Sequence, residues 1–201
     1  MQKIILASLL SAAAAFAPST SSGKAVTALN AEKSPAIPFL PYPENLKGYV
    51  GDDVAFDPLR ISDYFPMDYL RESELKHGRI CQMAVVGFIT VDLGFVVHPL
   101  GQGLTSATAH DTMVENGVMG NALVFIGFLE LVSYIAVSEM LQGSGREPGD
   151  FGFGNKFLEG MSEDEVKTMK YKELANGRLA MMAFGGMVTQ SVLYDKGFPY
   201  F

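Results

Sequence analysis

The hydropathy pattern along the chain predicts three long helices. Mostly apolar runs cover residues 80–97, 118–137 and 179–193, which are 18, 20 and 15 residues long. As helices, the first two runs measure about 27 and 30 Å, close to the roughly 30 Å hydrocarbon core of a membrane. The third measures only about 22 Å, so we expect the polar turn before it to be drawn into the membrane edge.

The residues that flank these runs set the expected ends of the helices. Pro66 suits the first turn of a helix, and Pro99 follows the end of the first run. Ser162 supplies a capping side chain and is followed by first-turn acids. We therefore expect helices at about 67–97, 117–140 and 162–193. This pattern predicts an all-α membrane protein with three transmembrane helices.

The N-terminal residues 1–31 have the composition of a targeting segment. Lys3 precedes an apolar run over residues 4–15, as in a signal peptide, and residues 16–31 are rich in Ser and Thr without any acid, as in a plastid transit peptide. Their junction resembles the Ala-Phe-Ala-Pro junction of bipartite presequences in algae with red-lineage secondary plastids. We expect a bipartite presequence over 1–31 and one domain over 32–201; a secretory signal with a spacer is the alternative.

The first and third predicted helices carry two copies of one motif. ELKHGRICQMAVVG (74–87) and ELANGRLAMMAFGG (173–186) share Glu, Leu, Gly, Arg, Met, Ala and Gly at a constant offset of 99 residues. The preceding loops, GDDVAF (51–56) and PGDFGF (148–153), also resemble each other. Two similar loop-helix units predict that the first and third helices cross as a pseudo-twofold pair.

The spacing of the motif determines which charges can pair. Glu and Arg are five residues apart in each copy, so they point about 140° away from each other on one helix. Charges near lipid need partners, and a crossed pair supplies them as Glu74 with Arg178 and Glu173 with Arg79. Close approach of the two helices is favoured by small residues on each: Gly78, Ala84 and Gly87 on the first, and Gly177, Ala180 and Ala183 on the third.

Several motif residues have the chemistry of metal ligands. A carboxylate that is paired with an arginine retains oxygen lone pairs, so Glu74 and Glu173 can each also bind a metal as an axial ligand. On the third helix, Glu173, Asn176 and Gln190 share one face. Ala180, Ala183 and Met187 between them leave room for a flat macrocycle, and His77 is the counterpart of Asn176 on the first helix.

The motifs ExxHGR and ExxNGRLAM resemble those of the chlorophyll-binding light-harvesting complex family over essentially the whole mature sequence. The resemblance implies that Mg of chlorophyll is bound by Glu74, His77, Glu130, Glu173, Asn176 and Gln190, with Arg79 and Arg178 as bridging arginines. Glu130 in FIGFLE matches the ligand position of the family's middle helix. The loop GYVGDDVAFDPL resembles the carotenoid-contacting loop, although its second copy has Gly154 in place of Asp57.

The presequence and the short C-terminal end are similar to those of fucoxanthin-chlorophyll a/c proteins. This resemblance implies chlorophyll a, chlorophyll c and fucoxanthin or related carotenoids as cofactors, and a plastid thylakoid membrane as the location. It implies photosystem I or II, thylakoid lipids and other antenna subunits as partners. The expected function is light absorption and excitation transfer. The alternatives are a photoprotective relative that dissipates energy and a pigment-free membrane scaffold.

Composition and the remaining polar residues exclude other classes. The chain is 48% apolar and only 18% charged, and its net charge of −7 argues against nucleic-acid binding. The single cysteine excludes an internal disulfide, and no catalytic triad or phosphate loop is recognisable, so we do not expect an enzyme. Gln82, Asn121 and Glu139 are expected to form interhelical or interfacial hydrogen bonds. Asp92 has no evident partner, and His98 and His110 are expected in a surface loop.

Overall fold

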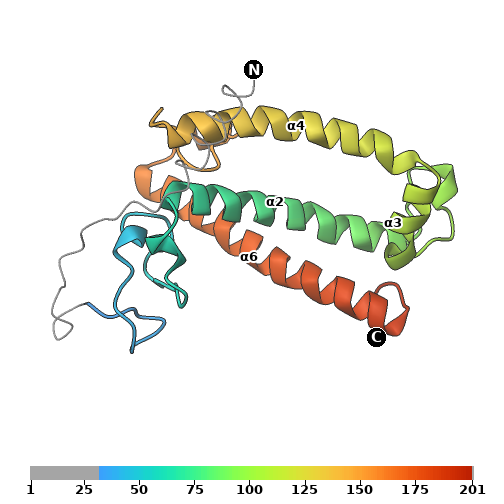
Figure 1. Ribbon diagram of the computed structural model, residues 1–201, viewed down its shortest axis with the longest axis horizontal. Helices are drawn as coiled ribbons and strands as arrows, with labels where there is room; N and C mark the ends of the chain where they lie inside the picture. The colour runs from blue at the N-terminus through green and yellow to red at the C-terminus, as the bar shows by residue number, and fades with distance from the viewer. Residues whose placement is uncertain (1–31, 201) are drawn as a thin grey trace, which may run out of the picture. The chain divides into compact units, whose positions relative to one another are not determined.

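The computed structural model of the protein describes residues 32–200, which form two compact units, 32–65 and 66–200 (Figure 1). The expected presequence, residues 1–31, lies outside the described residues. In the smaller unit the two 3-10 helices are η1 (Glu44–Leu46) and η2 (Ile61–Asp63). The larger unit holds the long helices α2 (Met67–Asp92), α4 (Val118–Leu141) and α6 (Glu163–Tyr194), and its shorter elements are η3 (Pro99–Gly101), α3 (Ser106–Glu115) and α5 (Asn155–Leu158).

The smaller unit is held together by polar side chains that bind backbone groups. Ser34 Oγ donates to Ala55 O at 2.6 Å, and Asn45 Nδ2 donates to Ser62 O at 2.8 Å. Asp57 accepts hydrogen bonds from Ser62 N, Ser62 Oγ and Ile61 N. Burial alone would raise the pKa of Asp57, but these hydrogen bonds outweigh burial and lower the pKa. The Asp57 carboxylate is therefore a structural centre of this loop.

Helix α2 ends at Asp92 and not near residue 97 as expected. Gly94 takes a left-handed conformation, with φ of +82°. Its N–H donates to Val91 O, and Phe95 N–H donates to Thr90 O, both at 2.9 Å. This pair of bonds is the Schellman closure that glycine favours at helix ends. The predicted end near residue 97 was wrong because the apolar residues continue past Gly94, whereas the helix does not.

The segment between α2 and α4, which was expected to be a loop, contains helix α3. Thr105 and Thr108 form a capping box at its start. His110 therefore lies on a helix, although it is exposed and pairs with Asp111. Asp92 gains its missing partners here, because it accepts from Ser106 N at 2.7 Å and Ser106 Oγ at 2.9 Å. It also accepts from Phe198 N at 3.0 Å, so one carboxylate anchors both α3 and the C-terminal tail to α2.

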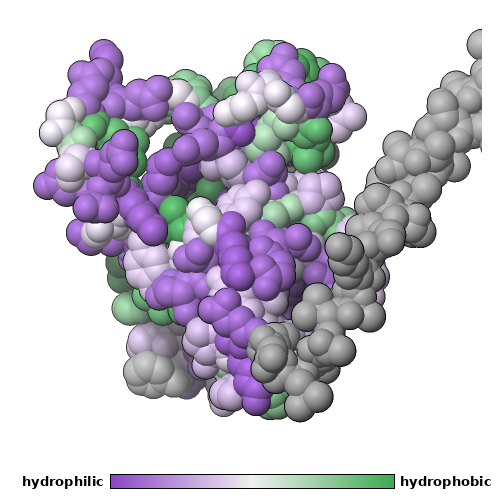
Figure 2. Space-filling model, turned by 90° about the vertical axis from the view of Figure 1, so that its left-hand side faces the viewer, coloured by the Kyte–Doolittle hydropathy of each residue, from purple (hydrophilic) through white to green (hydrophobic). Residues whose placement is uncertain are grey.

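Helix α4 is apolar along its whole length. Among the described residues it is the one helix whose length and composition are sufficient to cross a membrane. All of residues 121–132 are exposed, so most of its apolar side chains have no protein partner. Figure 2 shows one face of the molecule, on which most of the described residues in view are hydrophilic. At the start of α6, Ser162 and Glu165 form a capping box.

The contact between α2 and α6 is built on two glycines. A Cβ atom on Gly78 would lie 2.8 Å from Gly177 Cα, and one on Gly177 would lie 3.2 Å from Gly78 Cα. The two backbones therefore touch directly. Farther along, the rings of Phe88 and Phe184 pack edge to face at 5.2 Å. Gly87 was expected at this contact, but a Cβ there would meet nothing within 4 Å.

Replacing Gly78 with alanine tests the importance of this contact. The new methyl group would meet backbone atoms, which cannot rotate away, so Gly78→Ala should lower the free energy of unfolding by about 1–3 kcal/mol. The measurement is thermal unfolding of the purified protein in detergent, followed by circular dichroism. Gly87→Ala is the matched control, since it adds the same methyl group to open space. Equal stability of the two variants would contradict a backbone contact at Gly78.

Candidate functional site

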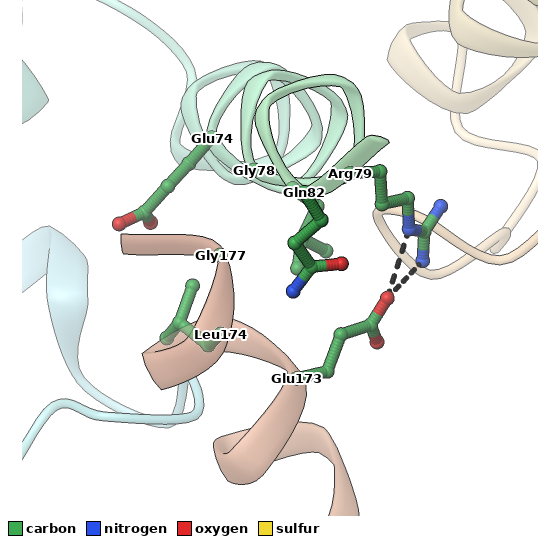
Figure 3. A pocket seen from close by; sticks show the side chains of 8 residues that line it. Glu74, Gly78, Arg79, Gln82, Glu173, Leu174 and Gly177 are labelled. Atoms are coloured by element: carbon green, nitrogen blue, oxygen red, sulfur yellow. Dashed lines mark hydrogen bonds and ion pairs between the residues drawn. The ribbon is translucent and has the colours of Figure 1, made fainter. Parts of the chain in front are cut away.

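Two reciprocal ion pairs flank the glycine contact between α2 and α6. Arg79 Nε on α2 donates to Glu173 Oε1 on α6 at 2.8 Å, and Arg178 Nε on α6 donates to Glu74 Oε1 on α2 at 2.7 Å. Figure 3 shows Arg79 reaching Glu173 on one side of the crossing, while Glu74 points away on the other. Both pairs expected from the five-residue spacing are therefore present.

The two carboxylates differ in their further partners. Glu74 also pairs with Arg71, one helical turn earlier, at 3.1 Å between Glu74 Oε2 and Arg71 Nη1, and the Arg71 side chain is only 8% exposed. Glu173 depends on Arg79, whose Nη1 donates as well to Gly149 O at 2.9 Å. Sequence reasoning missed Arg71, although its spacing of three residues from Glu74 was a usable signal.

A buried glutamate braces the loop that precedes α6. Glu72 on α2 is 3% exposed; it accepts from Gly149 N at 2.5 Å and pairs with Arg146 Nη2 at 3.1 Å. The neighbouring Glu147 pairs with Lys170 on α6. Residues 146–149 are therefore attached to both crossed helices. This brace was not expected, because it depends on contacts between residues far apart in the sequence.

His77 and Asn176 occupy equivalent positions and make equivalent hydrogen bonds. His77 Nδ1 lies 2.7 Å from Ser73 O, and Asn176 Nδ2 donates to Lys172 O at 2.8 Å. Because a carbonyl only accepts, His77 Nδ1 carries a proton, and in the neutral imidazole Nε2 is then the nitrogen with the free lone pair. Asn176 likewise keeps its Oδ1 oxygen. Both side chains are exposed. Each can therefore offer a neutral atom with a free lone pair, in a fixed orientation, to a ligand outside the helix pair.

Glu130 on α4 has a partner that sequence reasoning did not identify. Lys76 Nζ on α2 forms an ion pair with Glu130 Oε2 and donates to Ser133 Oγ at 3.2 Å. Lys76 gave little signal, because its reach to α4 depends on how α2 and α4 are placed in three dimensions.

Of the remaining predicted residues, Gln190 lies apart from these pairs and Gln82 lies between them. Gln190 is exposed near the end of α6, whereas Ala180, which was expected to leave open space beside the ligands, is buried at 9% exposure. Gln82 lines the small gap between the crossed helices with Glu74 and Glu173 (Figure 3). That gap has about 10 Å³ of room, enough for one water molecule. A large ligand therefore does not fit inside this gap.

The donor arrangement favours a metal that arrives already held by a macrocycle. Within residues 32–200, no three His, Cys, Asp or Glu side chains gather where they could hold a free metal ion. Each predicted ligand instead offers a single donor atom at a separate place. The carboxylates of Glu74, Glu130 and Glu173 are each paired with a cation. Single, charge-compensated donors would suit a magnesium ion that a porphyrin-type ring already holds.

Comparison with known proteins gives a consistent result. The family model described as Chlorophyll A-B binding protein matches residues 42–192. The chain is 34% identical to the fucoxanthin-chlorophyll a-c binding protein of Trieres chinensis, covering 96% of this chain and 95% of that protein. It is 28% identical to fucoxanthin-chlorophyll a-c binding protein A of Phaeodactylum tricornutum, covering 96% and 97%.

A second group of relatives is named for stress. The chain is 31% identical to light-harvesting complex stress-related protein 1 of Chlamydomonas reinhardtii, covering 77% of this chain and 67% of that protein. The match to stress-related protein 3.1 covers 64% of its length, so the chain spans about two thirds of these relatives. The family match, which covers α2 and α4 in full and α6 up to residue 192, shows that the chain belongs to the chlorophyll a/b-binding protein family.

Proposed function

We propose that the protein is a light-harvesting antenna protein that binds chlorophylls and carotenoids and passes excitation energy to a photosystem. The observation that carries this proposal is the matched geometry of His77 and Asn176. The N–H of each side chain is bonded to the backbone carbonyl four residues earlier. A neutral atom with a free lone pair is left on the outer side of each helix. The repeat of this arrangement in two copies of the motif is unexplained by packing alone.

The proposed ligands of chlorophyll magnesium are six side chains. Each has an atom with a free lone pair, and each is either neutral or paired with a cation. They are Glu74, His77, Glu130, Glu173, Asn176 and Gln190. Bound chlorophyll would supply light absorption, and each of these side chains would hold the magnesium of one chlorophyll. The residues of the chain fix the position and the electrostatic surroundings of each ring. Because no bond is made or broken, positioning is the whole contribution of the protein.

The pigment types and the location rest on the relatives. Two relatives that match this chain over almost its full length are named fucoxanthin-chlorophyll a-c binding proteins and chloroplastic. We therefore assign chlorophyll a, chlorophyll c and fucoxanthin to this chain, and place it in the plastid thylakoid membrane. Its partners there would be thylakoid lipids, photosystem I or II and other antenna subunits.

In the proposed membrane arrangement α2, α4 and α6 all span the bilayer, and α2 and α6 form a pseudo-twofold pair. The three helices contain 26, 24 and 32 residues, which correspond to about 39, 36 and 48 Å. The reciprocal ion pairs support this arrangement, because they neutralise the charges that α2 and α6 would carry into the membrane edge. Unpaired, these charges would oppose insertion.

A photoprotective function is the second candidate, and the stress-related relatives favour it. Both functions need the same ligands, so the two are separated by the fate of the excitation. We expect the purified pigment-protein complex to contain chlorophyll c and to keep a long chlorophyll fluorescence lifetime at neutral and acidic pH. A strongly shortened lifetime would favour energy dissipation. A colourless protein after gentle purification would exclude both functions and leave the scaffold alternative.

Substitution of His77 tests the assignment of the ligands. His77→Leu removes the Nε2 donor and should lower the pigment content by about one chlorophyll per protein while the fold is kept. His77→Asn should retain it, because the second motif uses Asn176 at the same position. Pigment extraction and quantification provide the measurement. His110→Leu, which changes an exposed histidine of α3, is the control. An unchanged chlorophyll content in His77→Leu would overturn the assignment.

Removing the two arginines should have unequal effects. Arg178→Leu leaves Glu74 with Arg71 as a remaining partner, whereas Arg79→Leu leaves Glu173 without its cation and also breaks the bond to Gly149 O. We therefore expect Arg79→Leu to reduce the yield of assembled pigment-protein more than Arg178→Leu does. The yield can be measured by density-gradient separation after reconstitution. The reverse order would contradict the partner assignment.

A further inference from the structure

Lys76 lies where α2 faces the middle of α4. Its Nζ is bonded both to Glu130 and to Ser133, which are three residues apart and therefore on one side of α4. The side chains of Lys76 and Glu130 are 33% and 49% exposed. The pair is thus at the surface between two helices, where a large flat ligand has access to it.

The internal repeat shows that this lysine is not part of the common motif. At the offset of 99 residues that relates the two copies, the counterpart of Lys76 is Ala175. Helix α2 packs against α4, whereas α6 has no comparable contact with it. The lysine is therefore present only in the copy that faces Glu130, which points to a role specific to that carboxylate.

The charge of Glu130 gives this role its chemistry. Glu130 lies near the middle of α4, among exposed apolar residues such as Phe128 and Leu131. In apolar surroundings a charged carboxylate without a partner is costly. The Lys76 ammonium group supplies the opposite charge at Oε2 and leaves Oε1 available.

We propose that Lys76 is a positioning residue for pigment binding at Glu130: it neutralises the carboxylate through Oε2 and leaves Oε1 to bind a magnesium ion. Ser133 fixes the ammonium group in place. The inference rests on the proposed function, since it assumes that Glu130 binds chlorophyll. Glu130 on α4 would then resemble Glu74 and Glu173, because each of these proposed carboxylate ligands is paired with a cation from another helix.

The test is reconstitution of the full chain with chlorophyll and carotenoid, followed by pigment quantification and low-temperature absorption difference spectra. Lys76→Met should lose about one chlorophyll per protein, and Lys76→Arg should retain it because the charge is kept. The double variant Lys76→Met with Glu130→Gln should recover it, since an amide oxygen is a neutral donor that needs no cation. Lys167→Met, which removes an exposed lysine from α6, is the control.

The double variant separates charge compensation from simple docking of α4. If Lys76 only held α4 against α2, the double variant would be as depleted as Lys76→Met, and this result would overturn the inference. A full chlorophyll content in Lys76→Met would overturn it too. If circular dichroism shows that Lys76→Met does not fold, the chlorophyll content of the double variant still provides the test. A full content supports charge compensation, and a depleted content overturns it.

Failure of the underlying assumption looks different. In Glu130→Leu the ligand itself is absent, so a full chlorophyll content there would exclude Glu130 as a ligand, whatever Lys76 does. Loss of one chlorophyll in Glu130→Leu together with none in Lys76→Met would keep the ligand and refute the role of the lysine.

Discussion

The direct contact of the Gly78 and Gly177 backbones is the constraint on which the larger unit depends. A side chain at either position would meet the opposite backbone at 2.8 to 3.2 Å and would force the helices apart. Arg79 and Arg178 each lie one residue after these glycines, so the contact places both arginines beside the facing helix. Hydrogen bonds of 2.7 to 2.8 Å to the opposite glutamates follow from that closeness. The packing of the two glycines and the neutralisation of the two glutamates therefore depend on the same close approach of α2 and α6.

The same contact explains why the proposed ligands lie on the outer faces of the helix pair. The crossing leaves room only for about one water molecule between the helices, so no large group can enter. Donors are consequently useful only on the outer faces, where His77 and Asn176 lie. Each side chain is held by the carbonyl of its own preceding turn, which keeps its orientation independent of the partner helix. The crossing thus supplies rigidity, and each helix orients its own donor.

Sequence reasoning succeeded where the relevant geometry was local or repeated. The five-residue spacing of Glu and Arg excludes pairing within a helix by arithmetic alone, and the repeat supplies the partner. It failed at the end of α2, where Gly94 overrode a continuous hydropathy signal, and at α3, which is short and only weakly apolar. The partners of Glu72, Asp92 and Glu130 were also missed. Each lies at least 14 residues away in the sequence, so its identity depends on the folded arrangement.

Comparison of the two motif copies shows what the duplication keeps and what it changes. Glu, Gly and Arg are kept in both copies, and these residues form the crossing itself. The residues that differ face different neighbours: Lys76 faces α4, while its counterpart Ala175 does not. Arg71 pairs with Glu74 on its own helix, whereas its counterpart Lys170 turns to Glu147 in the preceding loop. The repeat therefore behaves as one packing unit used twice, whose outer residues are adapted to an asymmetric environment created by the single helix α4.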